Sequence, residues 1–148
     1  MTVFETSLNV VLVDTFNLIL KHEEEAINKI LSVPVSVTEA HVIEAVGKLK
    51  DRVTASGVAS LLNISKPTAT VAIQKLEERG FIQRIRCDAD RRKRLISLTE
   101  TGKKIEKYHR AFHEKMVKTI SGQFPEDEKK ILLSLINKLN LFFRMNFE

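Results

Sequence analysis

The chain has 148 residues, 43% hydrophobic and 29% charged, with a formal net charge of +5. This balance is typical of one globular domain and excludes a disordered or fibrous chain. The single cysteine, Cys87, excludes an internal disulfide and a CxxC metal or redox pair. The start has no leader-like pattern, and polar residues interrupt the most apolar segment, so we expect a cytoplasmic protein that does not span a membrane.

Hydrophobic spacing predicts two helices in the first third of the chain. Apolar residues recur at helical intervals from Leu8 to Leu31, and the pattern is broken at Pro34. Thr38 is in a position to cap a second helix, which we expect to end near residues 49–52. The first helix is long and the second is of ordinary length.

The next segment predicts a helix-turn-helix. Residues 54–63 predict a short third helix with Val58, Leu61 and Leu62 facing inward. A fourth helix is expected from Ser65, a good capping residue, to Gly80, which is suited to end a helix. Two short helices joined by a tight turn form this motif.

After residue 80 the apolar period changes from 3.6 to 2, which predicts a β-hairpin. Residues 81–86 and 93–99 form its strands, and four consecutive cations, residues 91–94, lie at its tip. The window 65–94 contains nine basic and four acidic residues, so it carries the whole net charge of the chain. Such a local excess of positive charge indicates a nucleic-acid-binding element attached to a neutral body.

Two further helices are expected after the hairpin, one from about residue 99 to 120 and one that starts at Pro125. The first and last helices have more apolar surface than the small middle domain can cover, which suggests a homodimer. We therefore expect a mainly α-helical fold with a small β-hairpin wing. Residues 1–33 and 100–148 form the helical dimerisation domain, and residues 34–99 form the winged helix-turn-helix domain.

A helix-turn-helix followed by a basic hairpin is the pattern of a winged-helix DNA reader. The fourth helix reads the major groove: Gln74 can pair with adenine, and Val71 and threonine methyls can contact thymine. In the wing, Asp90 can orient one of the neighbouring guanidinium groups. The expected contacts with a double-stranded operator are Ser65, Lys66, Thr68, Thr70, Val71, Gln74, Lys75, Arg84, Arg86, Asp90, Arg91, Arg92 and Lys93.

Other function classes explain the pattern less well. The sequence has no phosphate-binding glycine loop, nucleophile elbow or paired carboxylates typical of an enzyme, and no cofactor motif. A protein that only dimerises would not need its whole net charge of +5 concentrated in residues 65–94. A DNA-binding regulator accounts for both the basic window and the apolar terminal helices.

The chain resembles the MarR family of bacterial transcriptional regulators in three stretches: LEERGFIQR at the helix-to-strand junction, DRRKRLISLT in the wing and LTETG after it. The resemblance covers nearly the whole chain and implies a winged-helix dimer that reads a pseudo-palindromic operator. It places Thr68, Thr70, Gln74 and Lys75 at major-groove positions and residues 90–92 in the wing motif. Val71 departs from the family, many members of which have arginine there.

Three shorter stretches, EAHVIEAVG, RCDADRR and AFHEKMV, resemble the regulators of fatty-acid biosynthesis genes in Gram-positive bacteria. That subgroup implies a repressor whose co-repressor is a long-chain acyl group on acyl carrier protein. An effector pocket is then expected on the helices that link the dimerisation domain to the reading domain. Its expected residues are Phe16, His41, Ile43, His109, Phe112, His113 and Met116.

The histidines leave a second interpretation open. His109 and His113 are four residues apart, a spacing that can hold one metal ion on a helix face. With His41 and either Glu23 or Glu24 they match the ligand positions of the zinc-responsive members of the family. A hydrogen-bonded pocket or a dimer interface explains the same histidines without a metal.

Overall fold

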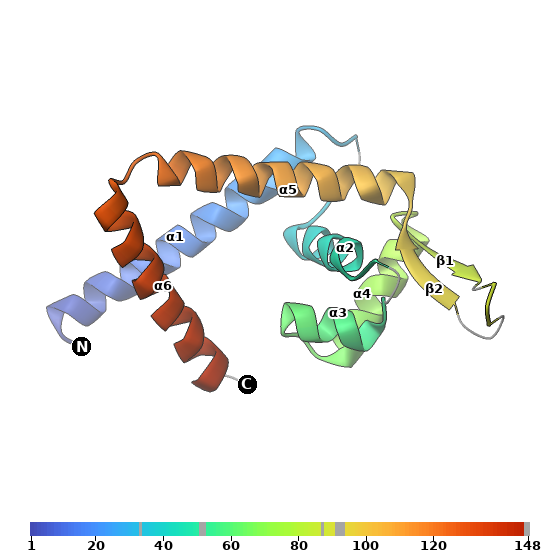
Figure 1. Cartoon of the computed structure of the whole chain (residues 1–148), viewed down its shortest axis with the longest axis horizontal. Coiled ribbons are helices and arrows are strands. Elements are labelled where there is room, and N and C mark those ends of the chain that lie inside the picture. Colours follow the sequence, from blue (N-terminus) through green and yellow to red (C-terminus); the bar gives the residue numbers. More distant parts are fainter. Residues whose placement is uncertain (33, 51–52, 87, 91–93, 147–148) are drawn as a thin grey trace. The chain divides into compact units, whose positions relative to one another are not determined.

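The computed structural model describes residues 1–32, 34–50, 53–86, 88–90 and 94–146. It confirms the predicted fold class: helices dominate, and one antiparallel hairpin lies between α4 and α5 (Figure 1). Residues 1–112 form one unit and residues 113–148 another, with the boundary inside α5. The elements are α1 (Val3–Asn28), α2 (Val37–Leu49), α3 (Ala55–Leu62), α4 (Lys66–Glu78), β1 (Ile82–Arg86), β2 (Arg94–Leu98), α5 (Glu100–Ser121) and α6 (Glu126–Asn146).

Polar caps place α1 several residues earlier than the hydrophobic pattern predicted. The hydroxyl of Thr2 accepts a hydrogen bond from the backbone N–H of Glu5, whose carboxylate accepts one from the backbone N–H of Thr2. At the other end, the side chain of Asn28 makes two hydrogen bonds, of 2.8 and 3.2 Å, with the backbone of Val35. The helix therefore ends at Asn28, not near Leu31.

The prediction that Thr38 caps α2 was wrong. Ser36 is the N-cap, and it forms a reciprocal pair of hydrogen bonds with Glu39, three residues later. Ser36 and Thr38 are both good capping residues. Only Ser36 has a glutamate, Glu39, three residues later, and this spacing completes the capping box.

The helix-turn-helix is confirmed. Thr54 caps α3, Asn63 makes the turn in the left-handed conformation with φ 54°, and Ser65 caps α4. The prediction that Leu61 faces inward was wrong: its side chain is 46% exposed, whereas Val58 and Ala59 are buried. A helix of two turns can bury only a narrow stripe.

The hairpin pairs β1 with β2 in the register Ile82 with Leu98 and Arg86 with Arg94. Gly80 precedes the hairpin with φ +78°, a backbone conformation that residues with side chains rarely adopt. Glycine at this position therefore allows the helix to end and the chain to turn into β1. The inner ends of the strands, at Ile82 and Leu98, are buried. The hairpin is thus attached to the core at its base and projects from it.

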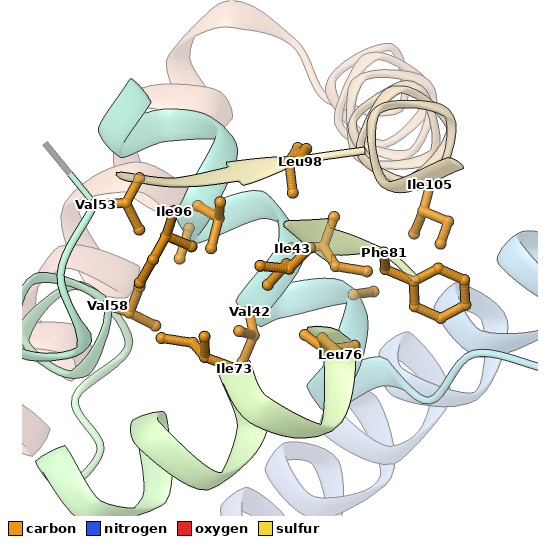
Figure 2. Close-up of a cluster of buried hydrophobic side chains, with 14 of the residues drawn as sticks. Val42, Ile43, Val53, Val58, Ile73, Leu76, Phe81, Ile96, Leu98 and Ile105 are labelled. Carbon is orange, nitrogen blue, oxygen red and sulfur yellow. The ribbon is translucent and has the colours of Figure 1, made fainter. Parts of the chain in front are cut away.

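An apolar core holds the reading helix in place. Figure 2 shows Val42 and Ile43 of α2, Ile73 and Leu76 of α4, and Ile96 and Leu98 of β2 directed toward one another, with Ile105 of α5 beside Phe81. The labelled residues are 0–9% exposed. Burial of one such side chain contributes about 1.5–3 kcal/mol, so the cluster fixes α4 against the body of the domain.

Contacts at the start of α5 explain two residues of the LTETG stretch, Thr99 and Gly102. The hydroxyl of Thr99 accepts from the backbone N–H of Gly102 and donates to the carbonyl of Gly80. A Cβ at residue 102 would lie 2.1 Å from the carbonyl oxygen of Phe81. Only glycine fits there, because the start of α5 passes directly over the backbone of Phe81, between α4 and β1.

Each unit exposes an apolar helix face. In the first unit, α1 leaves nine large hydrophobic side chains exposed, including Phe4 at 72% and Phe16 at 63%. In the second unit, α6 exposes Ile131, Leu133, Leu135 and others. α1 also meets the length and composition criteria for a membrane span, but one N-terminal helix of this kind is weak support for a membrane protein.

Candidate nucleic-acid interface and buried histidine site

The outer face of α4 is exposed and polar, as the sequence predicted. Val71 is 67% exposed, and no buried residue of the helix lies on this face. The hydroxyl of Thr70 donates to the carbonyl of Lys66 at 3.0 Å. The contacts predicted on this helix and at its cap are all exposed: Ser65, Lys66, Thr68, Thr70, Val71, Gln74 and Lys75.

Gln74 has the side chain best suited to read a base. Its amide donates to the carboxylate of Glu78 at 3.3 Å, one turn further along the helix. This hydrogen bond is exposed and long, so its exchange for the edge of an adenine costs little. The amide is therefore available to DNA.

An acidic anchor that the sequence reading missed fixes the end of the reading helix. Glu39 of α2 accepts a hydrogen bond from Arg79 at 2.5 Å, and the guanidinium of Arg79 also donates to the carbonyl of Pro34. The same guanidinium lies 4.8 Å from the ring centre of Phe81. Lys75, expected only as a DNA contact, has its Nζ 3.5 Å from Glu39. The capping-box position of Glu39 was the signal that could have revealed this anchor.

The pKa of the Glu39 carboxyl reflects this position. Desolvation raises it, but hydrogen bonds from Arg79 and the backbone of Ser36, together with the charges of Arg79 and Lys75, outweigh burial. The pKa therefore lies below its ordinary value of 4.5. The anchor is ionised at neutral pH.

Three of the predicted wing contacts, Arg84, Arg86 and Asp90, lie in the described part of the chain. Arg84, on β1, forms an ion pair with Glu77 of α4 at 2.9 Å, so it joins the wing to the reading helix. Arg86 is exposed and Asp90 is partly buried. Cys87, Arg91, Arg92 and Lys93 lie outside the described residues.

A buried carboxylate of α1 and a buried histidine of α5 both contact side chains of α2. Glu23 of α1 is 1% exposed and His109 of α5 is 0% exposed. The Nε2 atoms of His109 and His41 both contact the same Glu23 oxygen, the latter at 2.8 Å. Nδ1 of His109 lies 2.8 Å from Glu44. These contacts connect α1, α2 and α5 through charged and polar groups.

The pKa values at this site shift in opposite directions. Burial raises the pKa of Glu23, but the hydrogen bonds and charges of His109 and His41 outweigh it, so the pKa lies well below 4.5. The hydrogen bond that His41 donates to Glu23 raises the pKa of His41 above 6.5, with burial acting against it. The carboxylate is thus ionised, and protonation of His41 is favoured.

Of the residues predicted for an effector or metal site, the structure brings Glu23, His41 and His109 together and places Phe16 and Ile43 elsewhere. Glu23, not Glu24, contacts the histidines; Glu24 is exposed on α1. Ile43 belongs to the apolar core and Phe16 is exposed. His113 follows His109 by one turn of α5 and, like the partly buried Met116, belongs to the second unit. Phe112 is partly buried at the end of the first unit.

Comparison with known proteins matches this arrangement. A model described as MarR family matches residues 33–93, which contain α2, α3, α4 and the first wing strand. The crystal structure of Streptococcus pneumoniae FabT in complex with DNA is 32% identical in sequence, with a TM-score of 0.81, over 95% of this chain and 97% of that one. The chain belongs to the MarR family. It is thus a DNA-binding transcriptional regulator with a winged helix-turn-helix.

Other MarR relatives extend the comparison. The transcriptional regulator ZitR of Lactococcus lactis is 34% identical over 59% of this chain and 62% of its own length. BilQ of Clostridium symbiosum is 37% identical over 55% of this chain and 57% of its own length. These two alignments therefore cover less than two thirds of either relative. The S. aureus MepR–DNA complex, 17% identical with a TM-score of 0.73 over 90% of this chain and 94% of that one, shows the same fold.

Proposed function

We propose that this MarR regulator is a cytoplasmic homodimeric repressor of fatty-acid biosynthesis genes, and that a long-chain acyl group on acyl carrier protein strengthens its binding to DNA. The observation that carries the proposal is the similarity to FabT over almost the whole length of both chains. The resemblance of three separate stretches to the fatty-acid regulators supports it. They lie on α2, at the wing and on α5, so they are not one local motif.

The apolar faces support the dimer. Exposed hydrophobic side chains follow α1 in the first unit and α6 in the second, and no described residue of either unit covers them. Contiguous apolar surface of this kind is typical of subunit interfaces. We expect light scattering at micromolar concentration to give about twice the 16.9 kDa chain mass. A monomer under those conditions would contradict the dimer.

The acyl proposal predicts a ligand-dependent change in DNA affinity. Purified protein should bind upstream regions of fatty-acid biosynthesis genes more tightly in the presence of long-chain acyl carrier protein, because the effector binds the DNA-competent conformation better. Fluorescence anisotropy with labelled duplex would show a lower Kd. Unacylated carrier protein is the control, and equal affinity with both forms would reject the co-repressor.

One observation favours a second candidate, a zinc-responsive regulator. Ligand atoms of Glu23, His41 and His109 lie within 4.8 Å of one another, and a carboxylate with imidazoles is a donor set that zinc accepts. The same three groups also satisfy one another directly, since Glu23 contacts both rings. This direct contact favours the hydrogen-bonded network. Protein that retains stoichiometric zinc, and binds DNA only with it, would reverse the preference.

A further inference from the structure

The two carboxylate oxygens of Glu39, near the start of α2, have different partners. Oε2 accepts hydrogen bonds from the backbone N–H of Ser36 and from the guanidinium of Arg79. Oε1 is buried and makes no hydrogen bond within the described part of the chain, and it lies 3.5 Å from Nζ of Lys75. The contacts that cap α2 and hold the end of α4 therefore use one oxygen, and the other oxygen faces a lysine of the reading helix.

Lys75 lies at the border between the buried face and the reading face of α4. It directly follows Gln74, the residue expected to read a base, and Arg79 comes four residues later, so Lys75 and Arg79 lie on the same side of the helix. The side chain of Lys75 is 64% exposed, and that of Arg79 is 25% exposed. Of the two cations beside Glu39, Lys75 is therefore the more accessible to DNA.

The ammonium group of Lys75 can contact two anions at once. It has three N–H donors, so it can stay beside Glu39 while it binds a phosphate. A lysine without a partner samples many rotamers, and the loss of that freedom on binding weakens a complex. The ion pair adds little stability by itself, because the lysine is exposed to water. Its effect is on direction, since Glu39 restricts the position of the ammonium before DNA binds.

The charge of Glu39 also acts against non-specific binding. Non-specific affinity depends on the positive charge that the protein places near the phosphates, whatever the base sequence. Glu39 is ionised at neutral pH, so it lowers the positive potential around Lys75. A lysine beside this carboxylate therefore attracts a misplaced phosphate less strongly than a free lysine does.

We propose that Glu39 is a positioning residue for DNA recognition that acts through Lys75. It holds the ammonium group where the operator places a phosphate, and so it raises the ratio of specific to non-specific affinity. This role is separate from the capping of α2 and the contact with Arg79, which use the other oxygen. It goes beyond the fatty-acid role proposed above and requires no effector.

Glu39→Gln removes the contact with Lys75 and keeps the other contacts. The amide oxygen takes the place of Oε2, because Ser36 and Arg79 both donate there, and glutamine also completes a capping box. The amide NH2 group then replaces Oε1 and presents donors to the ammonium. Glu100→Gln is the matched control, since it removes a carboxylate that also pairs with a lysine, at an 86% exposed position of α5.

The probes are the duplex that the original protein selects from random DNA and a duplex of the same composition with its sequence shuffled. In Glu39→Gln, the ratio of the Kd for the shuffled duplex to the Kd for the selected duplex should fall about fivefold, the usual cost of immobilising one flexible side chain. Glu100→Gln should leave the ratio unchanged. Lys75→Gln should reduce the salt slope for the selected duplex by about 0.9 for each lysine removed. In that background, Glu39→Gln should not change the ratio further.

An unchanged ratio in Glu39→Gln overturns the proposal, as does an unchanged salt slope in Lys75→Gln. An equal fall in the Lys75→Gln background overturns it too, because Glu39 would then act through the fold alone, and an equal fall in Glu100→Gln would assign the effect to net charge. Carbon relaxation in the original protein needs no variant of Glu39: Cε of Lys75 should be more restricted than Cε of Lys66, the first residue of the same helix. Equal mobility of the two lysines overturns the proposal even if Glu39→Gln does not fold.

Discussion

Glu23→Ala is expected to lower the free energy of unfolding by about 3 kcal/mol, because it removes the shared partner of two histidines, one of them fully buried. When one member of a buried charged pair is removed, the charge of its partner stays buried without compensation. Urea unfolding followed by circular dichroism, at one fixed protein concentration, measures the change. The fixed concentration matters because dimerisation adds to the apparent stability.

His22→Ala is the matched control. His22 is also a histidine of this region and pairs with Glu25, but its side chain is 62% exposed, so the expected change is within about 0.5 kcal/mol. A Glu23→Leu/His109→Leu double variant should recover part of the lost stability, since an apolar pair leaves no buried charge unpaired. If Glu23→Ala is no more destabilising than His22→Ala, the network is not a structural element.

The network should also set the pH dependence of stability. The pKa of Glu23 is depressed, so its contribution is present above about 4.5 and is lost as the pH falls through the folded value. The pKa of His41 is raised, so its contribution is present below about 6.5 and is lost as the pH rises through the folded value. Both contributions are therefore present between about pH 4.5 and 6.5. In the Glu23→Gln variant, the free energy of unfolding should change less with pH on both sides of this window.

Val71→Glu is expected to weaken DNA binding on the order of a hundredfold. The side chain lies on the exposed face of α4, so a carboxylate there would meet the negative potential of the groove, and like charges at an interface cost several kcal/mol. Because Val71 is 67% exposed, the fold should be unaffected. Anisotropy titrations with operator DNA at fixed salt give the ratio of Kd values.

Val71→Arg separates the effect of charge from that of size. Many MarR members have arginine at this position, so the variant should bind at least as tightly as the original protein and gain preference for guanine. Comparable weakening by glutamate and arginine would mean that Val71 is not at the groove. Unfolding curves of both variants should superimpose on that of the original protein.

Local chemistry explains why most of the fold was predictable. The change of period at Gly80, the cap at Ser65 and the apolar spacing of α4 are all local, and each was confirmed. Errors arose where two local signals competed. Thr38 and Ser36 both suit a cap, and the choice depended on the carboxylate of Glu39.

The site was less predictable because it depends on contacts between distant residues. Glu39 and Arg79 are 40 residues apart, and Glu23 and His109 are 86 apart. No local pattern indicates that the 1% exposed Glu23, not the exposed Glu24, contacts the histidines.

The most direct test of the DNA-reading arrangement is selection of bound duplexes from random DNA, with the original protein and with Gln74→Ala. The original protein should select an inverted repeat whose half-sites lie roughly 10 base pairs apart, because a two-fold dimer presents α4 twice. Gln74→Ala should lose preference at one symmetry-related pair of positions, by about 1–3 kcal/mol, and keep the rest. A selected sequence without two-fold symmetry, or uniform weakening at every position by Gln74→Ala, would contradict the account.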